Sequence, residues 1–132
     1  MKSIIFLFFI GYTCLCFSQD YKVSDLKVRG NKKLKTSFVK KISRIKAGVK
    51  LDSSVIEADI KRLKRLPSVA HAYYQVFYSH DNHYKVFYNI VENFTIIPSA
   101  NVYTTNDDEF AYRLGLYEFN LFGYNIAFGG FY

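Results

Sequence analysis

Two clusters of side chains in this sequence have the types and spacing that could support chemistry. His80 and His83 flank Asp81, and imidazole and carboxylate ligands converging on a tight turn could bind a metal ion. Residues 107–109 form a run of three carboxylates, Asp107, Asp108 and Glu109. No further ligand is placed beside the histidines by their spacing. We therefore expect a solvated hairpin tip at the first cluster, a turn at the second, and no metal site.

Other catalytic patterns are missing from the sequence. It contains no G-x-S-x-G motif and no Gly-rich loop that could hold a phosphate. Its two cysteines, Cys14 and Cys16, both lie near the N-terminus, in a segment that we expect to be removed. These features predict a protein that is not an enzyme, with no catalytic residues and no cofactor.

The N-terminus is typical of a secretory signal. Lys2 precedes an apolar run from Ile4 to Ile10, and Cys16 and Ser18 occupy the −3 and −1 positions of a cut before Gln19. The run is shorter than the roughly 20 apolar residues that a spanning helix needs. We therefore expect residues 1–18 to be a cleaved signal peptide, with lipid attachment at Cys16 as the alternative.

Positive charge is concentrated in one part of the chain. The net charge is +7, and nearly all the lysines and arginines lie between Lys22 and Arg65. A basic segment of residues 61–65 could bind nucleic acid through Lys61, Arg62, Lys64 and Arg65, or it could be a solvated helix face or attract anionic lipid head groups. The export signal favours the last two, so we expect no nucleic-acid partner.

The first part of the mature chain alternates between strand and helix patterns. Residues 21–29 show strand alternation and end at the turn pair Gly30-Asn31. A short amphipathic helix is predicted from Thr36 to Ala47-Gly48. A second helix follows a capping box of Ser54 and Glu57 and ends by Leu66, before Pro67.

Two strands, 70–79 and 84–92, are predicted to form a hairpin with its turn at residues 80–83. Alternation places Ala72, Tyr74, Val76, Val86, Tyr88 and Ile90 on the inner face, and Tyr73, Phe77, Phe87 and Val91 on the outer face. The outer face is rich in aromatic residues, which indicates that another surface covers it.

Beyond Pro98 only strand patterns follow, over residues 99–105, 110–119 and 126–132. Tyr112, Leu114 and Leu116 alternate with Arg113, Gly115 and Tyr117, which is typical of a strand with one face on lipid and the other on a lumen. Because three strands cannot close a barrel, we expect residues 94–132 to be the N-terminal strands of an incomplete outer-membrane β-barrel, in a chain that is either a truncated product or a fragment of a longer protein.

The order of these elements resembles the polypeptide-transport-associated (POTRA) domain of the outer-membrane assembly and secretion superfamily that includes BamA, TamA and the two-partner secretion transporters. The resemblance rests on Gly30-Asn31, Gly48, Leu51-Asp52, the segment 66–69 (Leu-Pro-Ser-Val) and Val91-Glu92 in this order. Residues 116–123, Leu-Tyr-Glu-Phe-Asn-Leu-Phe-Gly, are similar to the start of that superfamily's barrel. The fold class is therefore expected to be α+β, with a β-α-α-β-β domain at 19–93.

The resemblance implies the periplasmic and membrane-entry part of an outer-membrane protein assembly or secretion component. Its partners would be client outer-membrane or secreted polypeptides, outer-membrane lipid and other envelope assembly proteins. Clients would add as a strand to the edge formed by Tyr73, Tyr74, Gln75, Val76 and Phe77. These residues could instead pack against a neighbouring domain, and the whole chain could be a freestanding periplasmic module that docks to other envelope proteins.

Overall fold

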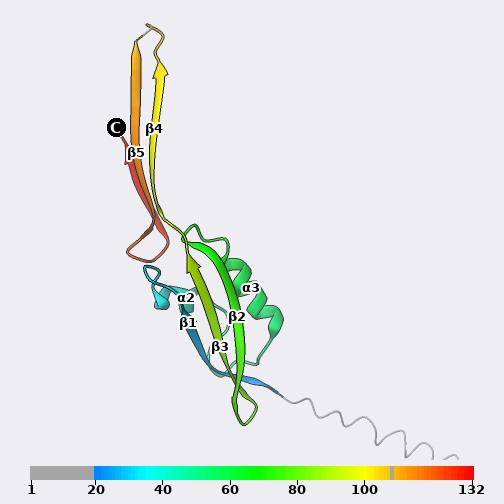
Figure 1. Cartoon of the computed structure of the whole chain (residues 1–132). Helices are drawn as coiled ribbons and strands as arrows, with labels where there is room; N and C mark the ends of the chain where they lie inside the picture. The colour runs from blue at the N-terminus through cyan, green and yellow to red at the C-terminus, as the bar shows by residue number, and fades with distance from the viewer. Residues whose placement is uncertain (1–19, 108) are drawn as a thin grey trace, which may run out of the picture.

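The computed structural model describes residues 20–107 and 109–132, so the predicted signal segment and the alternative at Cys16 lie outside the described residues. The chain forms two three-stranded sheets joined end to end (Figure 1). The first part contains β1 (Lys22–Arg29), α2 (Thr36–Ile42), α3 (Ser53–Leu63), β2 (Val69–His80) and β3 (His83–Glu92). The second contains β4 (Ile96–Thr104), β5 (Phe110–Leu121) and β6 (Ile126–Phe131).

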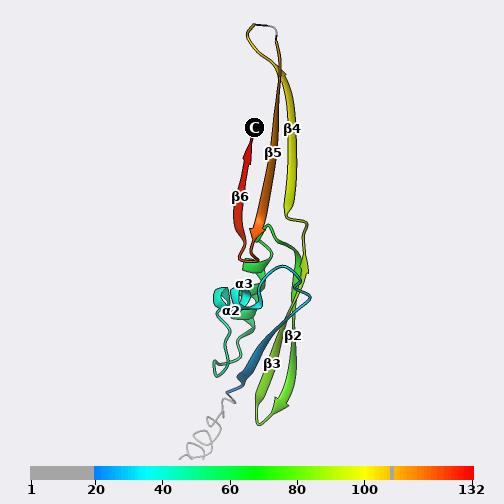
Figure 2. The same cartoon turned by 90° about the vertical axis from the view of Figure 1, so that its left-hand side faces the viewer.

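The first sheet has the strand order β1-β3-β2, with β1 parallel and β2 antiparallel to β3. Both helices cover the same face of this sheet (Figure 2). The core lies between the two helices and this face of the sheet. It consists of Val23, Leu26, Leu34, Val39, Ile45, Ile56, Ile60, Leu63, Val69, Ala72, Val86, Tyr88 and Ile90. The predicted β-α-α-β-β fold and the inner face of the hairpin are therefore confirmed.

The β2–β3 hairpin closes through Asp81 and Asn82, which have φ angles of 46° and 60°. Asp and Asn tolerate this left-handed conformation better than most residues, and a two-residue turn of this kind matches the twist of the flanking strands. The hairpin predicted at residues 80–83 is confirmed.

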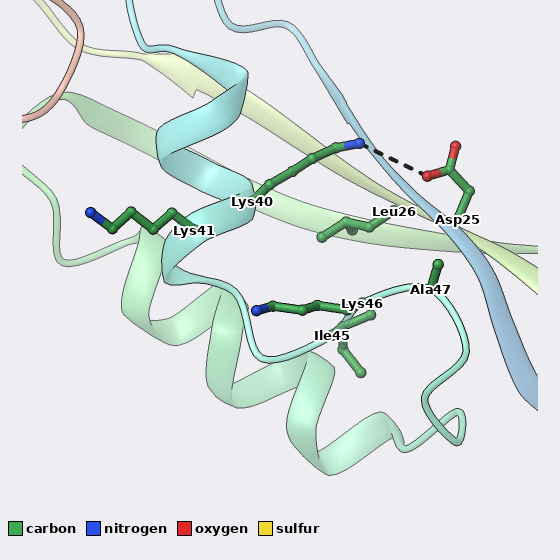
Figure 3. A pocket seen from close by; sticks show the side chains of 7 residues that line it. All are labelled: Asp25, Leu26, Lys40, Lys41, Ile45, Lys46 and Ala47. Atoms are coloured by element: carbon green, nitrogen blue, oxygen red, sulfur yellow. Dashed lines mark ion pairs between the residues drawn. The ribbon is translucent and has the colours of Figure 1, made fainter.

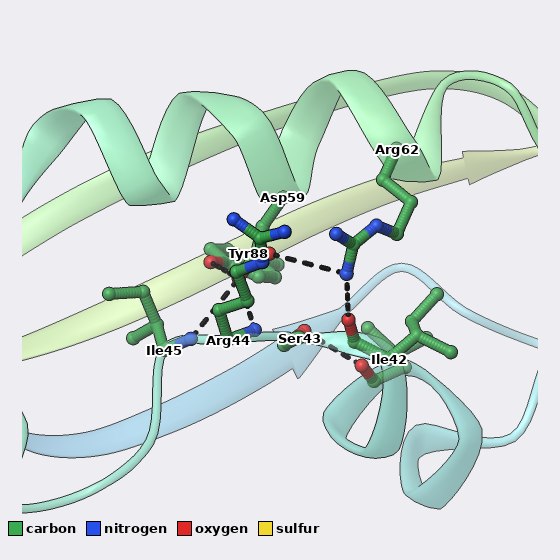
Figure 4. Close-up of polar contacts among 8 residues, drawn as sticks. Ile42, Ser43, Arg44, Ile45, Asp59, Arg62 and Tyr88 are labelled. Carbon is green, nitrogen blue, oxygen red and sulfur yellow. Dashed lines mark hydrogen bonds and ion pairs between the residues drawn. The ribbon is translucent and has the colours of Figure 1, made fainter.

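The first helix is shorter than predicted, because it ends at Ile42 and not at Ala47-Gly48. Ser43 adopts an extended conformation, and the backbone N–H groups of Arg44 and Ile45 donate to the Asp59 carboxylate at 2.8 and 3.2 Å (Figure 4). A carboxylate on α3 therefore binds the backbone that would have continued α2. Ile45 is buried, but it reaches the core from a loop.

The second helix begins with a different cap from the one predicted. Asp52 is the N-cap, and its side chain accepts a hydrogen bond from the Ser54 backbone N–H at 2.8 Å. Ser54 therefore lies inside the helix, and Glu57 is exposed and too far along the helix to complete a capping box. Asp52 directly precedes the first helical residue, Ser53, and the side chain at this position can accept a hydrogen bond from a free N–H group of the first turn.

The second sheet is an antiparallel ribbon with the order β4-β5-β6. Its first strand starts at Ile96, so Pro98 lies inside β4, whereas the sequence placed the strand after it. Within the described part of the chain β4 is an edge strand, where the missing N–H of a proline is tolerated.

The register of the second sheet separates two faces. Ala100 pairs with Leu114 and Val102 with Tyr112 on one face, and Ser99 pairs with Gly115 on the other, where Asn101 pairs with Arg113. Directly opposed residues share a face, so one side of the ribbon is apolar and the other is more polar. The two-faced pattern predicted for β5 is confirmed.

Helices of the described residues are too short and too polar to cross a membrane.

The Asp59 side chain, which is 1% exposed, is the centre of a polar network inside the first core. Besides the two N–H groups of the loop, its Oδ2 atom accepts the Tyr88 hydroxyl at 3.0 Å (Figure 4). The Arg62 guanidinium lies 3.9 Å from Oδ1 and donates to the Ile42 carbonyl at 2.6 Å. Burial, together with the Asp59 charge, raises the pKa of Tyr88, so the phenol remains a donor.

We predict that Asp59→Ala lowers the free energy of unfolding of a fragment of residues 20–93 by about 3 kcal/mol, because it leaves buried donors without an acceptor. The fragment is suitable because the core lies wholly between Val23 and Ile90. Urea denaturation followed by far-UV circular dichroism measures the loss. Asp52→Ala, which removes an exposed capping carboxylate, is the control and should cost clearly less. Equal losses would contradict a central role for Asp59.

Candidate functional site

The five residues predicted to bind partners, Tyr73 to Phe77, all lie on β2, which is an edge strand of the first sheet. No strand of the described residues pairs with the outer edge of β2. The opposite edge differs, because the start of β1 is covered by a loop. In that loop Gly48 donates to the Val23 carbonyl at 2.7 Å, and the Val23 N–H donates to Val49 at 2.9 Å. The edge of β2 is therefore the more open of the two.

Side chains of β2 on the open face of the sheet form an aromatic surface. Tyr73 and Phe77 are 46% and 49% exposed. Phe87, predicted to face outward with them, is only 6% exposed, because the Arg29 guanidinium lies 3.9 Å over its ring and Phe77 meets it edge-on. Gln75 accepts a hydrogen bond from Asn89 at 3.2 Å. The open face therefore offers apolar contact at the edge and less at its centre.

The other side of β2 faces a groove beside α3. This groove has a volume of about 390 Å³ and runs along the open edge, where Tyr74 and Ala72 form one wall. Residues of α3 form the other, namely Glu57, Ile60, Lys61 and Lys64, so the wall carries two lysines and one carboxylate. Tyr74 and Val76 are half-buried against the core. A segment added to β2 would thus place alternate side chains over the aromatic surface and into a basic groove.

The basic residues of α3 are not all available to a partner. Arg62 is tied to the Ile42 carbonyl, while Lys61 and Lys64 are exposed. A second basic hollow of about 340 Å³ lies between α2 and β1, lined by Lys40, Lys41 and Lys46 (Figure 3). Lys40 lies 3.9 Å from Asp25 there.

The two histidines of the hairpin tip lie side by side, with ring centroids 5.9 Å apart. His83 Nδ1 donates to the Asp81 carbonyl at 2.7 Å, and His80 Nδ1 is 3.1 Å from the Ser79 hydroxyl. Within residues 20–107 and 109–132, no group of three or more His, Cys, Asp or Glu side chains could hold a metal ion.

A junction between the two sheets forms where the β5–β6 turn contacts the loop between β1 and α2 (Figure 1). The Lys35 backbone N–H donates to the Gly123 carbonyl at 2.9 Å. Gly123 has a φ of +80°, and a Cβ atom on it would lie 2.3 Å from the Lys33 carbonyl oxygen. Only glycine fits this approach.

Further contacts hold the same turn. The Ser68 hydroxyl donates to the Asn125 side chain at 2.9 Å, and Phe38 meets Tyr124 edge-on with ring centroids 6.4 Å apart. Inside the turn, the Asn125 N–H donates to the side chain of the buried Asn120 at 3.0 Å. The turn is therefore shaped by an internal hydrogen bond. It is held to the first part of the chain by three contacts, with Lys35, Ser68 and Phe38.

The loop on the other side of the junction is shaped by Glu92, the last residue of β3. Its carboxylate accepts the backbone N–H groups of Lys32, Lys33 and Leu34 at 2.7, 2.9 and 2.8 Å. Three convergent donors on one carboxylate form an anion-binding nest, which fixes the loop against the end of the sheet.

Sequence reasoning missed the roles of Asp59, Glu92 and Gly123. Asp59 lies three residues after Ile56 and four before Leu63, on the apolar stripe of α3, so its position carried a signal of burial. Glu92 and Gly123 stood in motifs that the sequence singled out, but their partners are 58 to 60 and about 90 residues away along the chain. Such distant contacts carry no local signal.

Comparison with known proteins agrees with this geometry. A three-stranded sheet with two helices on one face places the first part of the chain in the class of small β-α-α-β-β domains. Residues 21–93 match the model of the POTRA family, surface antigen variable number repeat, which is more than half of the chain. The chain therefore belongs to this family.

The fold extends beyond the family match. A crystal structure of BamA from Haemophilus ducreyi lacking POTRA domains 1–3 matches with a TM-score of 0.71 and 20% sequence identity, over 83% of this chain. The matched region is 21% of that protein, so the chain spans about a fifth of its length. The fold is thus a POTRA domain followed by strands like those that begin the BamA barrel. A search of curated proteins finds no match.

We predict that Gly123→Ala opens the junction, because the new Cβ collides with a backbone carbonyl. The measurement is the rate of disulfide formation between cysteines placed at Ser68 and Asn125 in the full chain in detergent. If the variant weakens the contact between the turn and the loop by only about 1.4 kcal/mol, the ratio of docked to undocked molecules falls roughly tenfold. The rate of disulfide formation should fall by a similar factor.

The matched control is Gly48→Ala. Gly48 also has a positive φ, of +85°, but a Cβ there meets nothing within 4 Å. It therefore carries the same conformational cost without the collision. If both variants slowed the cross-link equally, close approach at the junction would not be its basis.

Proposed function

We propose that this chain is the periplasmic and membrane-entry part of an outer-membrane protein assembly or secretion component. Residues of the POTRA domain would lie in the periplasm, and β4 to β6 would lie in the outer membrane. The outer edge of β2, over Tyr73 to Phe77, would bind an extended segment of a client polypeptide by strand addition. Other envelope assembly proteins are expected as further partners.

The client-binding part of the proposal is supported by a difference between the two edges of the first sheet, since a loop pairs with the start of β1 and nothing among the described residues pairs with the outer edge of β2. An uncovered strand presents backbone donors and acceptors that another extended chain can satisfy. β2 is 12 residues long, and among the described residues nothing covers its outer edge. The adjoining groove carries Lys61 and Lys64 against the single carboxylate of Glu57, so a client with acidic or polar residues at alternate positions would fit best.

The membrane part of the proposal is supported by the apolar face of the second sheet. Val102, Phe110 and Leu114 on this face are 74%, 83% and 53% exposed. Contiguous apolar patches of this kind are rare on proteins that are surrounded by water, and they mark surfaces that contact lipid or other proteins. The opposite face carries Arg113, which stacks on Phe131 at 4.6 Å and suits a polar lumen.

This face also weighs against the alternative of a freestanding periplasmic module, which would leave β4 to β6 without an apolar environment. The two functions differ in how the protein is recovered from cells. A membrane component requires detergent for extraction, whereas a freestanding module appears in the soluble periplasmic fraction.

The test of strand addition is site-specific photo-cross-linking in cells. A photoreactive phenylalanine at Gln75 should capture client polypeptides as covalent adducts, because Gln75 lies at the open edge. Lys27 is the matched control, since it pairs with Phe87 in the same row of the sheet as Gln75 but lies on the opposite strand. Adducts are expected at Gln75 at several times the yield seen at Lys27. Equal yields at both edges would show that β2 has no special role.

A further inference from the structure

An apolar groove runs along the outward face of the second sheet at the end nearest the junction. It has a volume of about 580 Å³, and its lining is apolar except for Glu118: Ile96, Leu116, Glu118, Leu121, Phe128, Gly129 and Gly130. The register places Ile96, Phe128 and the neighbouring Glu118 in one row across the three strands. The groove therefore lies on the same apolar face as Leu114 and Val102.

A second hollow of about 400 Å³ begins where the first one ends. Lys32, Lys33 and Lys35 line it together with Phe122, which is 75% exposed at the tip of the β5–β6 turn. The two hollows share Glu118 and Leu121, so they adjoin each other. The mainly apolar groove thus lies next to a cluster of ammonium groups, with Glu118 at the boundary between them.

The charges around this cluster leave one positive charge in excess. Glu118 lies 3.8 Å from the Lys33 ammonium and accepts the Asn120 N–H at 2.7 Å. Glu92 binds the backbone of the same loop. Three lysines less two carboxylates give a net charge of +1, which matches the single negative charge of a phosphodiester.

We propose that the two adjoining hollows together form a binding site for one glycerophospholipid of the membrane leaflet that faces the periplasm. The phosphate lies among Lys32, Lys33 and Lys35, and an acyl chain lies along Leu116, Leu121 and Phe128. The chemistry requires both halves, since lysines at a membrane surface attract lipid phosphate and the groove accepts hydrocarbon. The proposal rests on the proposed function, because it needs β4 to β6 to lie in the membrane.

A bound lipid would also affect the junction. Lys32, Lys33 and Lys35 lie in the loop between β1 and α2, and the Lys35 N–H in this loop donates to the Gly123 carbonyl. The apolar groove lies on β5 and β6, the strands that the β5–β6 turn connects. A phospholipid at this position contacts the loop between β1 and α2 and the second sheet at once, so it stabilises the docked arrangement.

Native mass spectrometry of the full chain, released from detergent after addition of phosphatidylglycerol, tests the site. The parent chain should retain one phospholipid. The triple variant K32Q/K33Q/K35Q removes the charges but keeps the backbone bonds, and retention should fall at least tenfold, since lysines near a lipid surface attract its phosphate groups. Dioleoylglycerol, which has no phosphate, should not be retained by the parent chain.

A second variant fills the groove. A Cβ on Gly130 meets nothing within 4 Å, so Gly130→Leu can enter the apolar hollow without disturbing the backbone. It should reduce retention as strongly as loss of the lysines. The control K40Q/K41Q/K46Q makes the same change of charge at the hollow shown in Figure 3, and it should retain lipid like the parent chain.

Resistance of each variant to alkaline extraction from membranes separates the two proposals. If the chains stay in the membrane but the site variants retain phospholipid as well as the parent does, or the control loses it equally, the lipid site is wrong while the proposed function stands. If the parent chain itself is extracted without detergent, both proposals fail.

Discussion

The arrangement of the POTRA domain depends on one buried carboxylate. A buried carboxyl group is costly unless it is hydrogen-bonded, and donors from two directions reach the Oδ2 atom of Asp59, while Oδ1 has only the Arg62 guanidinium at 3.9 Å. The loop after α2 supplies the N–H groups of Arg44 and Ile45, and β3 supplies the Tyr88 hydroxyl. The carboxylate therefore fixes α2, α3 and the central strand together. Both helices are held on one face, which leaves the other face and the edge of β2 open.

A second carboxylate has a comparable effect at the other end of the sheet. Glu92 gathers three N–H groups of the loop between β1 and α2, so the loop projects its lysines and the Lys35 N–H toward the second sheet. The close fit of Gly123 follows from that loop shape. The hydrogen bonds of Glu92 at the end of β3 thus set the conformation of the loop that contacts the second sheet. The same loop places Lys32, Lys33 and Lys35 next to the apolar groove.

The sequence predicted the elements well because their signals are local. Alternation identified the hairpin strands, and the Asp81-Asn82 turn has the residues that such a turn favours. The prediction of α2 was wrong at its end, because amphipathic spacing continued to Ile45 while a distant aspartate captured the backbone. The edge position of β2 followed from the resemblance to the family. The junction and the charge balance around it could not be predicted, since their members are brought together only by folding.

The position of β2 relative to the junction gives the open edge a direction. β2 begins at Val69, and the preceding Ser68 donates to Asn125 in the turn between β5 and β6. Its far end is the hairpin tip at Asp81, at the opposite end of the sheet. A segment that added along the whole edge of β2 would therefore run from the distal tip to the base of the second sheet. Because Gly123 and Ser68 hold this base against the POTRA domain, the end of that segment would reach the second sheet at a fixed place. Loss of the junction would leave the edge intact but would separate it from the second sheet, so in the proposed function the binding of a client and its delivery would depend on different residues.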